Sequence, residues 1–154
     1  MTTVNIFGEY DESFPSLNGG DFAVVVVKKV YHKAVEGVKV ELASQFEEIK
    51  AHSFADVKGN KIEVAGYPVE VCDKTEKNYL FHDEGDVQEN GGPMDNIAFV
   101  TANASKGQDG CPAVMNNKLV GLFSGINTEE DNSEDIIVNL ITPEVVNWIN
   151  TIQI

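Results

Sequence analysis

The chain has few basic residues for its length, and this shortage limits its partners. Among its 154 residues, lysine and arginine together number 11 against 25 aspartates and glutamates, so the formal net charge is −14. A protein without a basic surface cannot neutralise phosphate groups, so we expect no binding to nucleic acid or to anionic membrane surfaces. The charge leaves cations and cationic partners open as ligands, beside the simpler interpretation of a soluble, self-repelling surface.

Cysteines and long apolar runs are also scarce. Cys72 and Cys111 are too few for a disulfide framework. The longest apolar run, Phe22–Val27, has the length of a strand and is too short to cross a membrane. The N-terminus lacks the basic start and the long apolar stretch of a signal peptide. We therefore expect no membrane-spanning segment and no signal peptide in this chain, and its localisation stays unknown.

The sequence offers no recognisable metal-ligand pattern. The acidic run Glu129–Asp135 lacks the spacing and the glycine of an EF-hand loop, so we interpret it as a charged hairpin tip, with weak calcium binding as the alternative. His32, His52 and His82 have no metal-ligand spacing to the cysteines, and we expect them at the surface. We predict neither a metal nor a cofactor.

What the sequence does contain is a series of short segments typical of strands. Hydrophobic residues make up 42% of the chain, enough for one globular domain with a core. Turn residues separate alternating or β-branched segments, which predicts an all-β barrel or sandwich. The predicted strands cover residues 4–10, 21–27, 37–42, 61–68, 78–82, 96–101 and 136–140, with 69–72 as an extension, and residues 113–114 and 119–123 form a hairpin around Asn116 and Asn117.

A helix is predicted at the C-terminal end of the sheet-forming segments. Thr142 can cap it and Pro143 suits its first position. The apolar residues that follow at helical spacing are Val145, Trp148, Ile149 and Ile152. A second, short helix over residues 45–52 is the weaker prediction.

The segment Gly107–Pro112 carries the most specific motif of the chain. It reads Gly-Gln-Asp-Gly-Cys-Pro and runs into an apolar strand, a polar turn and a second apolar strand, Leu119–Phe123. This arrangement resembles the nucleophile loop of trypsin-like serine proteases, where the motif reads Gly-x-Ser-Gly-x-Pro. Asp109 stands at the position of the attacking serine, and Gly107 lies in the part of the loop that forms the oxyanion hole.

Other segments resemble the same family in the same order along the chain. Val64–Pro68 is similar to the Gly-Tyr-Pro strand of the glutamyl endopeptidase-like branch. The further matches are Ile6–Asp11 with the Gly-Glu strand of the first barrel, Asp21–Val26 with the strand of the triad aspartate, Leu119–Leu122 with the strand after the nucleophile loop, and Ile141–Ile149 with the closing helix. The resemblance implies a trypsin-like fold: residues 1–30 as a remnant of the first barrel, 31–141 as a near-complete second barrel, and 142–154 as the C-terminal helix.

The departures from the family pattern bear directly on catalysis. A carboxylate at Asp109 cannot be activated by proton removal as a hydroxyl can, and its charge would repel a developing oxyanion. No histidine precedes Asp21, the position of the triad aspartate, and the first strands of the first barrel are missing, so the chain is expected to be truncated. Phe123 stands near the position where the glutamyl endopeptidase branch carries a histidine that binds an acidic side chain.

The residues around the loop are candidates for binding a substrate or partner: Gln108, Cys111, Phe123, Ser124 and Gly125. Two of the loop residues carry alternatives. Asp109 could bind a cation or the basic side chain of a partner, or be a solvated turn residue in a vestigial site. Cys111 could act as a thiolate nucleophile, or be a small buried core residue.

These observations predict a catalytically inactive trypsin-like homologue that acts as a protein-binding module. Its partner would be a protein or peptide, or a second copy that pairs through open strand edges such as Phe22–Val27. Two alternatives stay open: an active serine- or cysteine-type endopeptidase whose missing histidine segment comes from another chain, and an acidic cation-binding protein.

Overall fold

The computed structural model describes residues 2–7, 22–27, 48–69, 80–89, 94–105, 107–128 and 134–152. Several predictions fall outside these ranges: those for Asp21, His32, Cys72, the strand 37–42 and most of the acidic run 129–135. The weakly predicted helix over residues 45–52 is wrong in its described part, because residues 48–52 are not helical. None of the described helices is long and apolar enough to cross a membrane.

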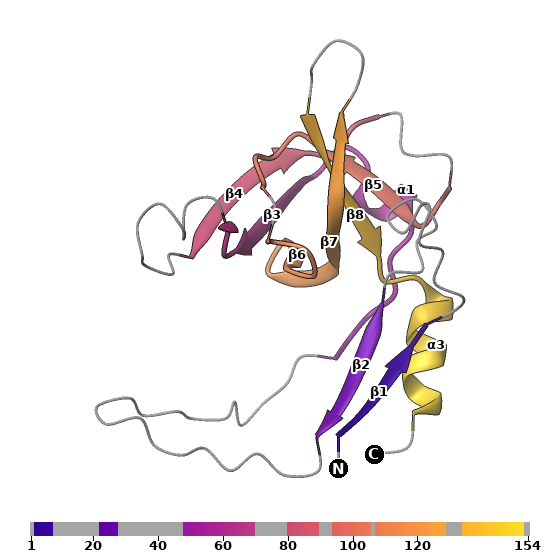
Figure 1. The fold of residues 1–154 in the computed structure, drawn as a ribbon. Helices are drawn as coiled ribbons and strands as arrows, with labels where there is room; N and C mark the ends of the chain where they lie inside the picture. Colours follow the sequence, from indigo (N-terminus) through magenta and orange to yellow (C-terminus); the bar gives the residue numbers. More distant parts are fainter. Residues whose placement is uncertain are drawn as a thin grey trace.

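A curled, antiparallel six-stranded sheet forms the main body of the described structure (Figure 1). Its strands lie in the order β4-β3-β6-β7-β8-β5. Their bounds are β3 Lys61–Gly66, β4 Phe81–Asp86, β5 Ile97–Val100, β6 Pro112–Met115, β7 Lys118–Thr128 and β8 Glu134–Leu140. This sheet confirms the prediction of a β-barrel that is followed by a helix.

The two edge strands of this sheet meet and close it at one end. Val87, just after β4, forms an isolated bridge with Val100 at the end of β5. Thr101 N donates to Asp86 O at 3.1 Å. At Gly85 the two segments come so close that a Cβ atom would lie 2.4 Å from Ala102 N. Glycine at this position is therefore what allows residues 101–102 to cross over β4.

Alternating side chains of the strands fill the interior of the curled sheet. Ile62 and Val64 of β3 point inward and are almost completely buried. From β8, Ile136, Val138 and Leu140 join the same cluster, and all three are 1% exposed or less. Burial of such side chains supplies most of the stabilisation of a domain of this size.

The hairpin between β6 and β7 turns at Asn116 and Asn117, as predicted. Both residues have left-handed backbone angles, with φ of 52° and 61°. A two-residue turn of this kind needs positive φ at both central positions, and asparagine tolerates it better than most residues. Beyond the turn, the register of β6 and β7 shifts between Ala113 and Val114. Val120 therefore has no partner residue on β6.

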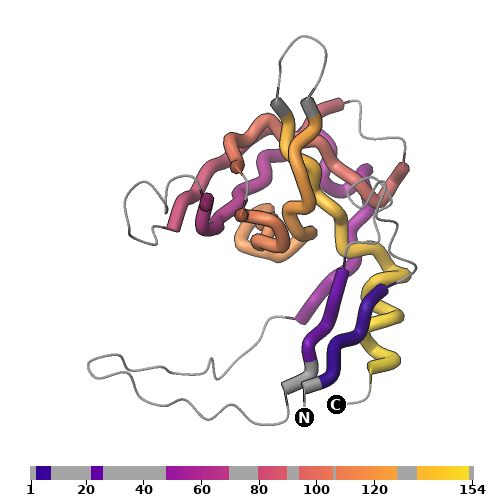
Figure 2. The backbone as a smooth tube through the Cα atoms, viewed as in Figure 1, coloured from indigo at the N-terminus to yellow at the C-terminus, as the bar shows by residue number. Residues whose placement is uncertain are grey.

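A second, two-stranded sheet lies against the C-terminal helix (Figure 2). It consists of β1 (Thr2–Ile6) and β2 (Ala23–Val27), and α3 covers Pro143–Thr151. Thr142 Oγ1 accepts a hydrogen bond from Val145 N at 3.4 Å, which confirms the predicted cap. Phe22 and Val145 are buried between these elements, and Phe7 contacts Trp148 with ring centroids 5.2 Å apart.

One short helix, α1 (Phe54–Val57), was not predicted. It begins with a capping box in which Ser53 N and Ser53 Oγ both donate to Asp56 Oδ2 at 2.7 Å. These bonds also lower the pKa of the Asp56 carboxyl. A Ser-x-x-Asp signal is present in the sequence, but four residues are too few to produce a helical periodicity.

Candidate functional site

The loop Gly107–Pro112 is fixed against β7 by backbone hydrogen bonds. Gly110 N donates to Phe123 O at 2.8 Å, and Phe123 N donates to Cys111 O at 2.9 Å. Within the loop, Cys111 N donates to Gln108 O at 2.9 Å. The loop therefore has a defined backbone conformation that the neighbouring strand supports.

Two glycines allow this conformation. Gly107 has φ of 93° and Gly110 has φ of 80°, a region that other residues adopt only with strain. At Gly107 space is also lacking, because a Cβ atom would lie 2.2 Å from Val69 Cγ2. The two glycines of the motif are therefore required for the shape of the loop.

The Gln108 side chain is buried and supports the loop from inside. It is 4% exposed, and its Oε1 accepts a hydrogen bond from Ser105 N at 2.8 Å. A Cβ atom at Gly66 would lie 3.1 Å from Gln108 Cγ, so the two segments pack tightly. The contribution of Gln108 to a binding surface stays a prediction.

Asp109 lies at the exposed tip of the turn. Within the described part of the chain, neither Gly107 N nor Asp109 N donates a hydrogen bond. The turn therefore combines an exposed carboxylate with two backbone amides that make no hydrogen bond within the described residues.

Cys111 has the properties of a core residue. It is a free cysteine, 9% exposed, and belongs to the main apolar cluster. Burial raises the pKa of its thiol; a hydrogen bond from the Ala65 backbone opposes this shift, and the Asp109 carboxylate adds to it. The thiol is therefore protonated at neutral pH, and the thiolate form that attacks carbonyls is disfavoured.

The two described histidines make no hydrogen bond to the loop, and His52 Nε2 is buried without a hydrogen-bond partner among the described residues. His82 Nε2 lies 3.1 Å from Glu63 Oε2 on the exposed side of β3 and β4. His52 N donates to Ile141 O at 2.7 Å, beside the start of α3. Among the described residues neither histidine is hydrogen-bonded to Asp109 or Cys111, and no group of three or more His, Cys, Asp or Glu side chains could hold a metal ion.

The residues predicted on the strand after the loop differ in exposure. Phe123 is 2% exposed and lies in the main core. Its side chain has almost no free surface, and its part in binding a partner stays a prediction. Ser124 and Gly125 are half-buried, next to an irregularity in the pairing of β7 with β8.

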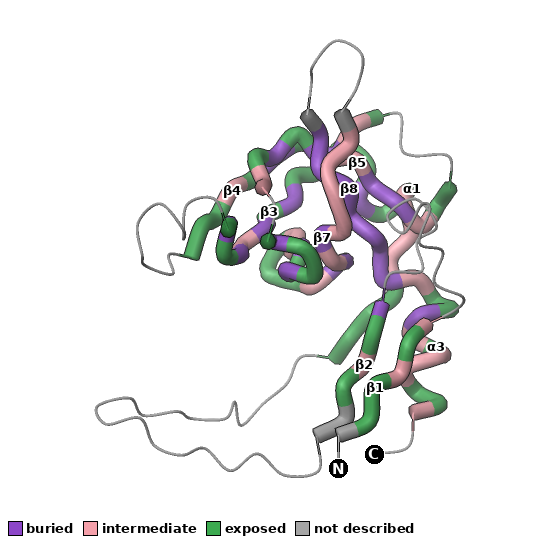
Figure 3. Tube along the Cα trace, in the orientation of Figure 1, coloured by how far each residue is buried: buried purple, intermediate pink, exposed green. Residues whose placement is uncertain are grey.

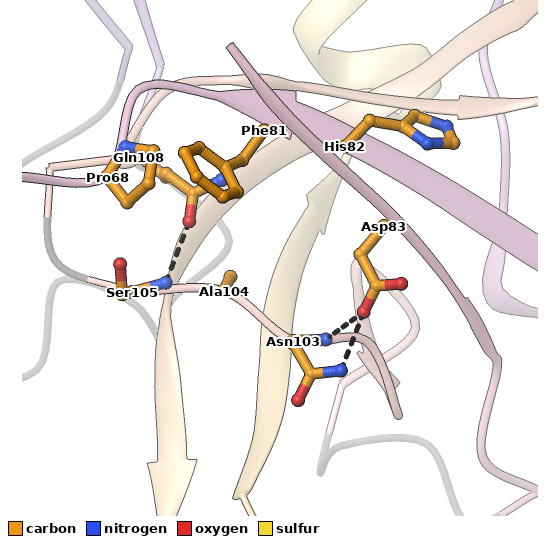
Figure 4. A pocket seen from close by; sticks show the side chains of 8 residues that line it. All are labelled: Pro68, Phe81, His82, Asp83, Asn103, Ala104, Ser105 and Gln108. Carbon is orange, nitrogen blue, oxygen red and sulfur yellow. Dashed lines mark hydrogen bonds between the residues drawn. The ribbon is translucent and has the colours of Figure 1, made fainter. Parts of the chain in front are cut away.

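A pocket of about 270 Å³ opens beside the loop and was not predicted (Figure 4). Its walls come from Pro68, from the first residues of β4 and from residues 103–105 and 108. Asp83 Oδ2 accepts hydrogen bonds from Asn103 N at 2.6 Å and from Asn103 Nδ2 at 2.9 Å. These bonds lower the pKa of the Asp83 carboxyl, so it is ionised at neutral pH.

The fold has a counterpart among solved structures. No protein-family model matches the chain, and no curated protein matches it. The chain is similar to a solved structure of a Glu endopeptidase in complex with MPD, at 21% sequence identity and a TM-score of 0.56. The similarity covers 68% of this chain but only 46% of the Glu endopeptidase, so the chain spans less than half of that protein. With its curled six-stranded sheet and C-terminal helix, the chain has a trypsin-like β-barrel fold.

Proposed function

We propose that this chain is a catalytically inactive homologue of trypsin-like proteases that acts by binding another polypeptide. The observation that supports this proposal most strongly is Asp109, an acidic residue at the nucleophile position of a loop whose backbone conformation is well supported. A carboxylate offers no proton for a base to remove, and it disfavours negative charge on a neighbouring carbonyl oxygen. Cys111, the other candidate nucleophile, is buried and protonated.

The surface that favours a binding role is the sheet of β1 and β2. Val4 pairs with Val25 and Ile6 with Ala23, so these four side chains share one face. Val4, Ile6 and Val25 are 59%, 61% and 54% exposed, and much of the tube of β1 and β2 is green, for exposed, in Figure 3. No charged residue interrupts either strand, although charges commonly protect open strand edges from unwanted pairing. An extended segment of a partner protein, or of a second copy, could add to this sheet.

Covalent probes test the catalytic part of the proposal. The purified chain is incubated with a fluorophosphonate and separately with iodoacetamide, with and without cell extract, and peptides are mapped by mass spectrometry. We expect no fluorophosphonate adduct, and alkylation of Cys111 only after unfolding. The Asp109→Ser variant serves as a control and should also stay unlabelled, because no described histidine is hydrogen-bonded to Asp109 or Cys111. Rapid native labelling of Cys111, or labelling that appears with extract, would favour the endopeptidase alternative instead.

Sedimentation velocity tests the binding part. The chain is examined at tens of micromolar, the range in which modest interfaces associate. We expect either a dimer of the purified chain or a complex with an added peptide in extended conformation. Val25→Lys should abolish the association, whereas Lys118→Gln in the β6–β7 hairpin, outside the two-stranded sheet, should not. A monomer at every concentration that also binds no extended peptide would contradict the proposed role.

A further inference from the structure

A second pocket, the lysine pocket, lies where the segment before α1 meets the start of β7. Its volume is about 240 Å³. Its walls are formed by Glu48, Lys50, His52, Lys118 and Leu119. Backbone hydrogen bonds hold the two segments near each other: His52 N donates to Ile141 O at 2.7 Å, and Ile141 N donates to Val120 O at 2.9 Å. The lysine pocket shares no residue with the pocket beside the loop, and Lys118 pairs with Met115, at the opposite end of β6 from that loop.

The two lysines of this pocket have no ion-pair partner among the described residues. Four lysines lie in the described part of the chain, and two of them line this pocket. Lys61, outside the pocket, pairs with Glu84 at 3.0 Å. Lys50 and Lys118 form no such pair with a described residue, although the whole chain has 25 acidic residues. The described walls contain two ammonium groups and one carboxylate, so their charge balance is positive in a chain whose net charge is −14.

His52 adds a nitrogen atom that lacks a hydrogen-bond partner. Its Nε2 is buried and is not hydrogen-bonded within the described part of the chain. A buried polar atom without a partner costs stability, which an acceptor on a ligand can recover. When Nε2 carries the proton, an anion oxygen that reaches it supplies this acceptor. Three side chains of the pocket can therefore donate hydrogen bonds from nitrogen to one anion.

Size and net charge restrict the anion to a small one. A volume of about 240 Å³ lies below the range of about 300–1,000 Å³ typical of drug-sized ligands. The net charge of −14 repels long polyanions such as nucleic acid. It acts less on a small ion in the pocket, because exposed charges farther away than about 8 Å are largely screened at physiological ionic strength. Lysine binds phosphate as a point charge, and two ammonium groups match the charge of a phosphate dianion.

We propose that the lysine pocket binds a phosphate group, either as the free ion or on a small molecule. The ammonium groups of Lys50 and Lys118 contact the anionic oxygens, and His52 donates a hydrogen bond to one of them. Leu119 adds an apolar wall, which suits the carbon atoms of a molecule that carries the phosphate. This site goes beyond the proposed function, since it requires neither an inactive loop nor an association of copies.

An NMR titration tests the proposal with two phosphate probes. The ¹⁵N-labelled chain, in a phosphate-free buffer near neutral pH, is titrated with sodium phosphate, with glycerol 3-phosphate, and with sodium chloride at equal ionic strength. We expect saturable shifts of the amides of residues 48–52 and 118–119 at millimolar concentration with at least one phosphate probe, and none with chloride. Tighter binding of glycerol 3-phosphate would support a phosphorylated small molecule as the ligand, and tighter binding of inorganic phosphate would support the free ion.

Four variants separate the pocket from general effects of charge. Lys50→Gln and Lys118→Gln should each weaken phosphate binding by about two- to fivefold, the usual effect of one exposed charge pair. Glu48→Gln should strengthen it by about twofold, because the variant removes the carboxylate that repels the anion. Lys58→Gln is the matched control and should leave the affinity unchanged, since Lys58 is exposed and forms no salt bridge with a described residue but does not line the pocket.

Far-UV circular dichroism verifies that each variant is folded. The proposal would be overturned by equal shifts with chloride, by equal weakening from Lys58→Gln and Lys50→Gln, or by the lack of a saturable shift with either phosphate probe. None of these results bears on the proposed function, because the lysine pocket contains no residue of the loop or of the β1–β2 sheet.

Discussion

The six-stranded sheet and the two-stranded sheet of this protein differ in how completely they bury their apolar side chains. In the large sheet, inward residues such as Val138 and Leu140 have no exposed surface. In the small sheet, Val4, Ile6 and Val25 are each more than half exposed, and the side chains that pack with α3 are Phe7 and Phe22, at the end of the two strands. A closed sheet with its own core is stable by itself, whereas two strands alone are marginal in water. The small sheet is thus the part of the described structure that gains most from a partner.

The largest effect should come from truncating the core of the large sheet. Phe123→Ala removes a ring that is 2% exposed and should reduce the free energy of unfolding by about 3–5 kcal/mol. Val25→Ala in the small sheet should change it by no more than about 0.5 kcal/mol, because the side chain is already in water. Urea titrations followed by circular dichroism measure both values. Equal losses would mean that the two sheets are not as different as their burial indicates.

Closure of the large sheet can be broken at Gly85. Gly85→Ala places a methyl group against the backbone of residues 101 and 102, which cannot rotate away, and should cost about 3 kcal/mol. Gly59→Ala is the control, because the surroundings of Gly59 are open and only its φ of 71° is unfavourable, at about 1 kcal/mol. The difference between the thermal midpoints of the two variants measures the tightness of the closure. A tolerated Gly85→Ala would show that the edge strands are held less closely than we describe.

Hydrogen exchange sharpens the contrast between the sheets without any substitution. The amides of β1 and β2 should exchange at least about tenfold faster than those at the centre of β7 and β8, since few buried contacts hold the small sheet closed. Addition of a bound partner should slow the exchange of β1 and β2 selectively. Uniform protection across both sheets in the free chain would contradict the contrast.

The smallest effect concerns the pH dependence of the hydrogen bonds that Asp83 accepts from Asn103. Its hydrogen bonds hold the pKa of the Asp83 carboxyl below the ordinary value of about 3.9, so the stabilisation is complete above that pH and is lost as the pH falls through the lower, folded-state value. The wild type should therefore keep its advantage over Asp83→Asn from neutral pH down to about pH 3.9 and lose it progressively at lower pH. Thermal midpoints of both proteins across this range measure the loss. If the difference between the two thermal midpoints does not vary with pH, the charge of Asp83 contributes nothing to the stability of the closed six-stranded sheet.

Much of the fold could be predicted from the sequence because its signals are local. The alternation in β3 gives its inward residues, and the Asn116–Asn117 turn gives the hairpin. Thr142 and Pro143 mark the start of α3. The loop backbone could be predicted for the same reason, since Gly107 and Gly110 are the residues that its positive φ angles require. The division of the chain at residues 30 and 141 stays a prediction.

The remainder depends on contacts that leave no mark in the sequence. Val120 and Phe123 are three residues apart and yet both point into the core, because the pairing of β6 with β7 skips a residue. Simple alternation therefore places Phe123 on the wrong face. The pocket joins Asp83 to Asn103 across twenty residues, and neither residue carries a local signal of that contact.

Proteolysis of a peptide library tests the central claim, that the loop keeps its shape without its chemistry, most directly. The purified wild-type chain is incubated with proteome-derived peptides, and new peptide termini are identified by mass spectrometry. The Asp109→Ala and Cys111→Ala variants are treated in the same way. We expect that neither the wild type nor the two variants produce new termini above the background of a sample without the protein. Cleavage by the wild type that either substitution abolishes would contradict it.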